Sequence, residues 1–191
     1  MQTADKIIYA TTSLLKNHGY RGVTTKAIAA EAQVNETTIF RHFGSKQGIL
    51  EAIVDRFSYL PQFEKLLKED AADNPRIDLM KVCENYLSFF RQNADIILIG
   101  FRDKGLLPKL DQKLSELPLH LHALLTEYFE RLKQKDIIVV EDSDLTAMSF
   151  LSMCYGFQMG MLMHGASAQV EERKFYEHSV ELFIRGLAFK G

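Results

Sequence analysis

Apolar residues recur every three or four positions along almost the whole chain, which is the spacing of one face of an α-helix. The first third contains four such stretches, separated by short polar breaks. They predict helices over residues 4–17, from Thr24 or Thr25 to Ala32, over residues 36–43, and from Lys46 until Pro61 ends or kinks the last one. The second and third of these helices are only about two turns long.

Particular residues mark where these helices stop and start. Gly19 can adopt the left-handed conformation that often ends a helix. The hydroxyl of Thr24 or Thr25, the amide of Asn35 and the hydroxyl of Ser45 can each accept a hydrogen bond from the first turn of the helix that follows. These signals place the short breaks of the first third at fixed positions.

The rest of the chain predicts longer helices over residues 77–93, 94–103, 117–134, 144–164 and 170–189. Alternating residues at 117–121 and the apolar run at 137–140 could each form a strand. A lone strand has no partner for its backbone hydrogen bonds, so we expect a helix start and a packed loop instead. The prediction is an all-α fold of about nine helices, with one domain at residues 1–50 and a larger one at residues 51–191.

Composition and charge narrow the class of protein. The 191 residues are 47% hydrophobic, but no run of about 18 apolar residues occurs, so we expect no membrane partner. The N-terminal residues lack the basic and apolar segments of a signal peptide, so we expect a cytoplasmic protein. Residues 1–50 carry six basic and three acidic side chains, whereas the remainder carries 17 and 22. The N-terminal part is therefore a candidate for binding a polyanion.

Neither an enzyme nor a metal site is indicated. The two cysteines, Cys83 and Cys154, lie apart in apolar contexts and predict buried free thiols. The six histidines include no pair on one helical face, and no nucleophile or phosphate-binding motif occurs. We therefore expect no catalytic residues, no metal and no cofactor. A ligand-binding or adaptor protein remains the alternative from another class.

Two short helices joined by a tight turn at residues 33–34 match the requirements of a helix-turn-helix motif, in which the second helix enters the major groove of DNA. In the helix predicted at residues 36–43, Ile39 and Phe43 point inward and Phe40 lies between the two faces. The side chains left for the groove are Glu36, Thr37, Thr38, Arg41 and His42.

Residues 22–50, GVTTKAIAAEAQVNETTIFRHFGSKQGIL, resemble the DNA-binding domain of TetR/AcrR-type transcriptional regulators. Paired threonines, Ile-Ala, a small-residue turn, Thr-Ile-aromatic and Ser-Lys occur in order and without gaps. The family usually has glycine in the turn where this chain has Gln33, which costs on the order of 1 kcal/mol if φ is positive there. By this resemblance, phosphates would be contacted by Thr25, Thr37, Phe40, His42 and Lys46, and bases by Lys26, Glu36, Thr38 and Arg41.

The resemblance also implies a homodimer that binds a palindromic operator, acts as a repressor and is released by a small-molecule effector. Its C-terminal domain would bind the effector and form the dimer. A core stripe is the simpler interpretation of the apolar positions there, but tyrosines among them would also suit a hydrophobic or amphipathic ligand. The candidate pocket residues are Cys83, Tyr86, Phe90, Phe101, Leu125, Tyr128 and Tyr155.

Small residues line one stripe of the helix predicted at residues 144–164, so another helix can approach it closely. Together with the last helix it resembles the family's dimer-forming pair, although an intrachain helix pair would give the same pattern. The candidate interface residues are Ser149, Ser152, Gly156, Gly160, Tyr176, Val180, Phe183 and Leu187.

Overall fold

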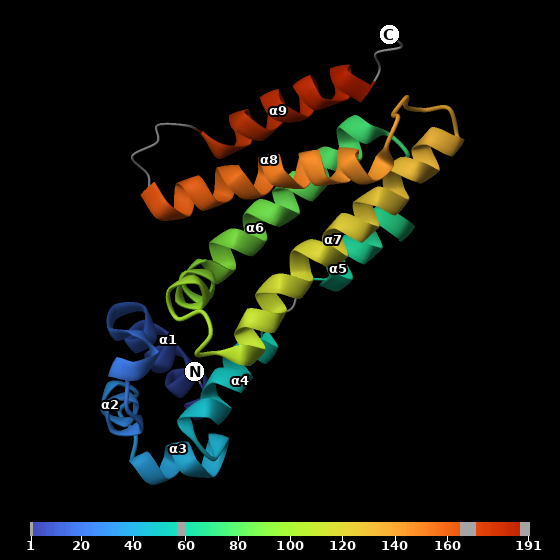
Figure 1. The fold of residues 1–191 in the computed structure, drawn as a ribbon. Coiled ribbons are helices and arrows are strands. Elements are labelled where there is room, and N and C mark those ends of the chain that lie inside the picture. Colours follow the sequence, from blue (N-terminus) through green and yellow to red (C-terminus); the bar gives the residue numbers. More distant parts are fainter. Residues whose placement is uncertain (1, 57–59, 165–170, 188–191) are drawn as a thin grey trace. The chain divides into compact units, whose positions relative to one another are not determined.

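The computed structural model describes residues 2–56, 60–164 and 171–187, and within these ranges it contains nine α-helices, one π-helical segment and no strand (Figure 1). The all-α prediction is confirmed. The elements are α1 (Thr3–Gly22), α2 (Thr25–Glu31), α3 (Glu36–Phe43), α4 (Lys46–Arg56), α5 (Leu60–Glu64), η1 (Lys65–Glu69), α6 (Pro75–Arg102), α7 (Pro108–Gln134), α8 (Ser143–His164) and α9 (Glu172–Leu187).

The chain forms two compact units, and two helices belong to both. The first unit comprises Met1–Ser58 and Asn93–Glu116, and the second comprises Tyr59–Gln92 and Leu117–Gly191. The end of α6 and the start of α7 therefore belong to the first unit. Our division at residue 50 concerns function and stays a prediction, because a compact unit defined by packing need not coincide with a functional domain.

The first unit is built around the apolar faces of α1 to α4. Ile7, Ile28, Ile39 and Ile49 are inaccessible to solvent, and each comes from a different one of these helices. Ile99 and Leu110 from the ends of α6 and α7 join the same core. The short helices α2 and α3 are thus held by packing rather than by length, since isolated helices of this size are not stable in water.

Two side chains hold the C-terminal end of α1: Arg102, the last residue of α6, and Asp103, which follows it. Gly19 has φ 71°, which breaks the helical path as we expected. Arg102 donates hydrogen bonds to the carbonyl groups of Leu15 and Lys16, and the backbone N–H of Tyr20 donates to Asp103 Oδ2 at 3.1 Å. These contacts pair backbone groups that a helix end leaves without partners.

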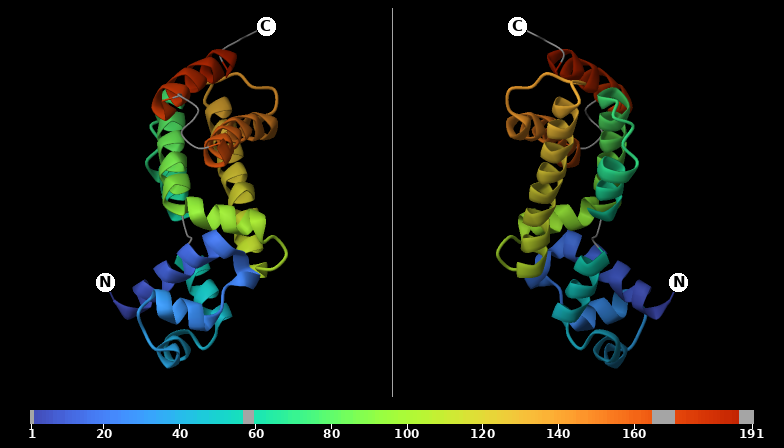
Figure 2. Two further views of the ribbon diagram at one scale, coloured as in Figure 1. Left: turned by 90° about the vertical axis from the view of Figure 1, so that its left-hand side faces the viewer. Right: turned by 90° about the vertical axis from the view of Figure 1, so that its right-hand side faces the viewer.

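In the second unit, α8 packs against both α6 and α9, and Figure 2 shows α8 and α9 next to one another in both views. The aromatic rings of Phe150 and Phe183 lie 5.3 Å apart, and those of Phe157 and Phe175 stack at 3.7 Å. Phe129 of α7 packs on Phe183 from the other side, at 6.0 Å. Aromatic side chains thus make up much of this core.

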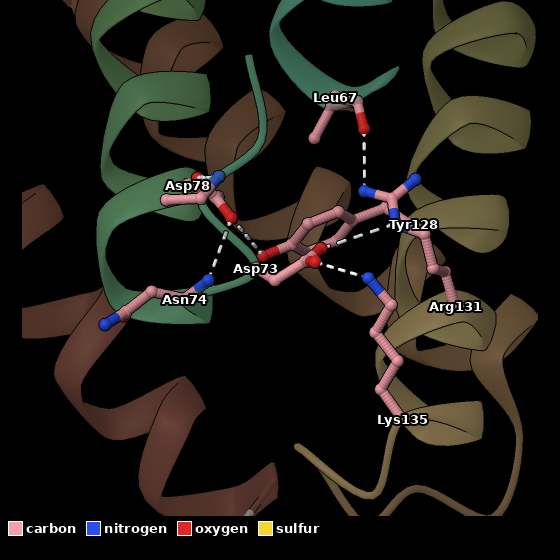
Figure 3. Close-up of polar contacts among 8 residues, drawn as sticks. Leu67, Asp73, Asn74, Asp78, Tyr128, Arg131 and Lys135 are labelled. Carbon is pink, nitrogen blue, oxygen red and sulfur yellow. Dashed lines mark hydrogen bonds and ion pairs between the residues drawn. The ribbon is translucent and has the colours of Figure 1, made fainter. Parts of the chain in front are cut away.

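A buried acid joins α6 to α7 and to the segment before α6 (Figure 3). Asp78 is inaccessible to solvent and accepts hydrogen bonds from the backbone N–H groups of Ala72 and Asn74 and from the Tyr128 hydroxyl, which lies at 2.9 Å. Nearby, Arg131 donates to the Leu67 carbonyl. Asp78 is therefore hydrogen-bonded on both oxygens, as a buried polar group generally is, and all three donors are neutral.

Two helix boundaries of the sequence prediction are wrong. Residues 77–93 and 94–103 form one helix, α6, because the asparagine and alanine at the expected break are compatible with a helix interior when its apolar face is buried. Helix α7 begins at Pro108 instead of residue 117, so Pro118 lies in its interior and not in its first turn. Proline removes one backbone hydrogen bond, and buried Leu110 and Leu121 on either side of it favour continuing the helix.

Among the helices of the described ranges, none is both long enough and apolar enough to cross a membrane.

Candidate nucleic-acid interface

The turn between α2 and α3 closes through backbone hydrogen bonds. Thr24 caps α2, since its hydroxyl accepts from the Ala27 N–H at 3.1 Å, as predicted. The N–H groups of Gln33 and Val34 then donate to carbonyl groups of α2, and Gln33 has φ 55°. A side chain in this left-handed region costs on the order of 1 kcal/mol, so the turn has the same backbone geometry that glycine would adopt more easily.

α3 spans the predicted residues, with one face inside and one outside. Ile39 is fully buried, while Thr37, Arg41 and His42 are exposed and Phe40 is 49% exposed. Asn35 lies at the N-terminal cap, but its side chain accepts no capping hydrogen bond, contrary to our expectation. The exposed side chains of α3 can therefore contact another molecule without any change of the core.

Thr25 and Glu36 are joined to each other across the motif. The Thr25 hydroxyl donates to Glu36 Oε1 at 2.5 Å, which links the first residue of α2 to the first residue of α3. Both side chains are half-buried. The contact joins the start of α3 to the start of α2, and it places a carboxylate beside the hydroxyl and basic side chains of the motif.

Lys46 makes contacts that sequence reasoning missed. Its ammonium group donates to the carbonyl groups of Tyr20 at 2.8 Å and Val23 at 2.7 Å, and it lies 4.0 Å from the centre of the Tyr20 ring. Burial lowers the pKa of Lys46. The side chain thus joins the start of α4 to the end of α1, and only one N–H is left over for a phosphate.

Two glycines shape the connection from α3 to α4. Gly44 ends α3 with φ 72°, and Ser45 caps α4 by accepting from the Gly48 N–H at 3.0 Å, as predicted. A Cβ atom on Gly48 would lie 1.9 Å from the Phe43 carbonyl oxygen. Sequence reasoning gave Gly48 no role, because a glycine in a helical stretch looks only like a weak helix former.

The exposed cations of the motif are available to a ligand. No described residue forms an ion pair with Lys26 or Arg41, although both are exposed. Arginine presents several donors in a fixed plane and suits phosphate groups and the guanine edge alike. Together with the hydroxyls of Thr37 and Thr38, these cations give the motif the chemistry expected for contact with the DNA backbone and bases.

The structure disperses the predicted pocket residues. Phe101 is 45% exposed and belongs to the first unit, whereas the other six lie in the second. Leu125 and Tyr128 are completely buried, and the Tyr128 hydroxyl is occupied by Asp78. Their helical spacing could not distinguish a packed core from a pocket wall.

The other four predicted pocket residues do lie together. Cys83 and Tyr86 are buried; the Tyr86 and Phe90 rings are 4.9 Å apart, and Tyr155 adjoins Phe90 at 6.4 Å. Cys83 Sγ is 3.9 Å from Cys154 Sγ, so the thiols are free and buried as predicted but adjacent rather than separate. This hydrogen bond and burial raise the pKa of the Cys83 thiol, which makes it a poor nucleophile.

The second unit contains an open cavity of about 540 Å³ that the sequence analysis did not predict. Its apolar walls come from Met80, Leu87 and Tyr176, and its rim carries charged groups, including the ion pair between Arg91 and Glu172. The remaining lining residues are Glu84, Ser88, Gln92, Glu171 and Arg173. Its size falls in the usual range for small-molecule sites.

The predicted interface residues divide between surface and core. On α8, Ser149, Ser152 and Gly156 are exposed, and a Cβ atom added at Gly156 or Gly160 would meet nothing within 4 Å. On α9 the prediction must be corrected. Tyr176, Val180 and Leu187 are buried inside the protomer, and Phe183 packs on Phe129 and Phe150. The periodic apolar residues of α9 are the ones that face its own core.

Comparison with known proteins agrees with this geometry. Residues 7–53 match the model of the bacterial regulatory proteins of the tetR family. The Bacillus subtilis protein YvkB, an HTH-type transcriptional regulator, is 31% identical over 187 residues, which is 97% of each chain.

Solved structures share the fold along the whole chain. The Pseudomonas aeruginosa protein NalD, the secondary repressor of the MexAB-OprM multidrug efflux pump, aligns with a TM-score of 0.77 at 16% identity and covers 99% of this chain and 98% of its own. PfmR, a regulator from Thermus thermophilus, aligns at 0.73 with 21% identity and 99% of both chains. The chain therefore belongs to the TetR family of helix-turn-helix, DNA-binding transcriptional regulators.

Proposed function

We propose that this regulator is a homodimeric repressor that binds a palindromic operator through α3 and is released from it by a small hydrophobic or amphipathic effector. The observation that carries the proposal is the exposed face of α3, on which Thr37 and Arg41 stand free while Ile39 anchors the helix from behind. One α-helix fits the major groove of B-DNA, and its exposed N-terminal residues then reach the base edges.

The α8 surface supports the homodimer. Leu145, Met148 and Tyr155 are 63%, 48% and 39% exposed, and they lie with Ser152 on one stripe with alternating three- and four-residue spacing. Gly156 and Gly160 leave room beside that stripe for a second helix. A second copy of the chain would cover this surface about a two-fold axis, and the same axis would relate the two half-sites of a palindrome.

The cavity in the second unit supports the effector. Apolar walls with charged groups at the rim suit a molecule that has one apolar and one polar end. A ligand that prefers one arrangement of the helices shifts the population toward it, and a coupling of about 1–3 kcal/mol changes operator affinity by roughly 5- to 150-fold. If the helix arrangement that the effector prefers separates the two α3 helices by a distance that does not match the operator, the protein leaves the DNA and repression ends.

Selection from a random pool of duplexes tests the proposal. We expect the purified protein at physiological salt to enrich a palindrome whose half-sites lie about one helical turn, 34–36 Å, apart. The control is the double variant Thr38→Ala/Arg41→Ala, which keeps the buried Ile39 anchor and should enrich no sequence. Equal enrichment by both proteins would show that α3 does not specify the site. Failure of the wild-type protein to enrich any duplex would favour an adaptor without sequence preference.

A further inference from the structure

We propose that Glu36 specifies a cytosine in each half-site of the operator, with Thr25 as the residue that positions its carboxylate. The inference rests on the proposed function and adds to it the identity of one base. It starts from the acidic first residue of a helix whose exposed face otherwise carries hydroxyls, an aromatic ring and basic groups.

The carboxylate of Glu36 is held at one end and free at the other. Thr25 Oγ1 donates to Oε1 at 2.5 Å, and no described residue donates to Oε2. Glu36 also takes part in no ion pair among the described residues, although Lys26 and Arg41 lie within the same motif. Oε2 is therefore available as an acceptor while Oε1 is held by Thr25, and both atoms lie at the N-terminal end of α3, whose residues reach base edges in a helix-turn-helix complex.

A carboxylate can contact only certain base edges. It is an acceptor without donors, so the acceptors of guanine and the O4 atom of thymine repel it. Adenine presents its N6 amino donor, but the neighbouring N7 atom is an acceptor and repels a carboxylate. Cytosine presents its N4 amino group, and glutamate accepts from that group in the major groove. Bringing a carboxylate close to the phosphates is unfavourable, and among the four bases cytosine offers the hydrogen bond that offsets this cost.

Thr25 restricts where the carboxylate can go. A glutamate side chain has several rotatable bonds, and an unrestrained one could turn away from the groove toward solvent. The hydrogen bond to Thr25 holds Oε1 against the start of α2, which restricts the positions open to Oε2. Thr25 thereby contributes to base choice through Glu36, in addition to any phosphate contact of its own.

The variant Glu36→Gln tests the proposal, because it keeps the size of the side chain and an oxygen that can accept from Thr25. With its oxygen held by Thr25, glutamine presents a donor NH2 group in place of Oε2, which suits the acceptors of guanine or thymine and not the N4 amino group of cytosine. Selection with this variant should therefore lose the cytosine at one position of each half-site. In fluorescence anisotropy, we expect the wild-type operator to bind the variant about tenfold more weakly. Random duplex should bind it more tightly, since one negative charge near the phosphates is gone.

The opposite signs of these two changes separate the possible roles of Glu36. If Glu36 had only a structural role, Glu36→Gln would weaken binding to both operator and random duplex. If Glu36 contacted no base and had no structural role, the lost negative charge would strengthen binding to both. Either result overturns the inference. If the wild-type protein enriches a palindrome whose bases do not change in Glu36→Gln, the proposed function stands and the cytosine assignment is wrong. If it enriches no palindrome, the proposed function and this inference both fail.

A second pair of variants tests the positioning role of Thr25. Thr25→Val removes the hydroxyl at nearly constant size, and Thr25→Ser restores it. We expect Thr25→Val to reduce the preference for cytosine over the other bases at the assigned position several-fold, and Thr25→Ser to recover it. A preference that is identical in all three proteins would contradict the positioning role.

Discussion

The variant Gly48→Ala is expected to lose about 2–3 kcal/mol of unfolding free energy and to bind operator about tenfold more weakly or worse. The added methyl group would lie 1.9 Å from the Phe43 carbonyl oxygen, far inside any permitted contact. The obstructing atom belongs to the backbone at the end of α3, so it cannot rotate away as a side chain could. Relief requires α3 and α4 to move apart, which displaces the helix that enters the groove.

The sign of this effect is informative, because alanine normally stabilises a helix interior by about 1 kcal/mol relative to glycine. The control Gln47→Ala places the same residue one position earlier, where the side chain is exposed. Denaturant unfolding followed by circular dichroism should show a loss for Gly48→Ala and little change for Gln47→Ala. A stability of Gly48→Ala equal to or above that of wild type would show that the two helices do not approach as closely as described.

Met148→Lys is expected to convert the dimer to a folded monomer and to lower operator affinity about 100-fold or more. The side chain is 48% exposed in the protomer, so a lysine there costs little within one chain. In a two-fold interface the change occurs twice and buries two charges without partners. A monomer contacts a single half-site and loses the gain that two linked contacts provide.

The control for this variant is Leu119→Lys. Leu119 is a similarly exposed apolar residue, 67% accessible, but it belongs to α7 and not to the α8 stripe. Analytical ultracentrifugation should give a monomer for Met148→Lys and a dimer for Leu119→Lys and wild type, with equal helical content in all three. A dimeric Met148→Lys protein with unchanged operator affinity would exclude the α8 stripe as the interface.

The DNA-binding part of the fold could be predicted from sequence because its signals are local. Thr24 and Ser45 determine helix starts through their own hydrogen bonds, and the structure places both as expected. The positive φ of Gln33 agrees with the glycine that the TetR/AcrR pattern usually has at this place in the turn. What local signals could not give are the Lys46 ammonium on the end of α1, which joins residues far apart in the sequence, and the close approach of Gly48 to the Phe43 backbone, which depends on the angle between α3 and α4.

The second unit was predicted less well for a related reason. Apolar residues at helical spacing show that a face is buried, but they do not show what covers it. Val180 and Leu187 are covered by their own protomer, while Met148 and Leu145 remain exposed. Likewise, Tyr128 looked like a polar group in a pocket and is instead the partner of buried Asp78 (Figure 3). Only the three-dimensional arrangement distinguishes a core, a pocket and an interface.

The central claim is that two α3 helices of one dimer contact the two half-sites of one operator. The most direct test changes only the DNA: five base pairs are inserted between the half-sites of the selected palindrome, and affinity is measured by fluorescence anisotropy. Because B-DNA turns once in about 10–10.5 base pairs, the insertion moves one half-site to the opposite face of the duplex. The account predicts that affinity falls to the level of random duplex. Unchanged affinity would mean that each half-site is bound independently, which would contradict the claim.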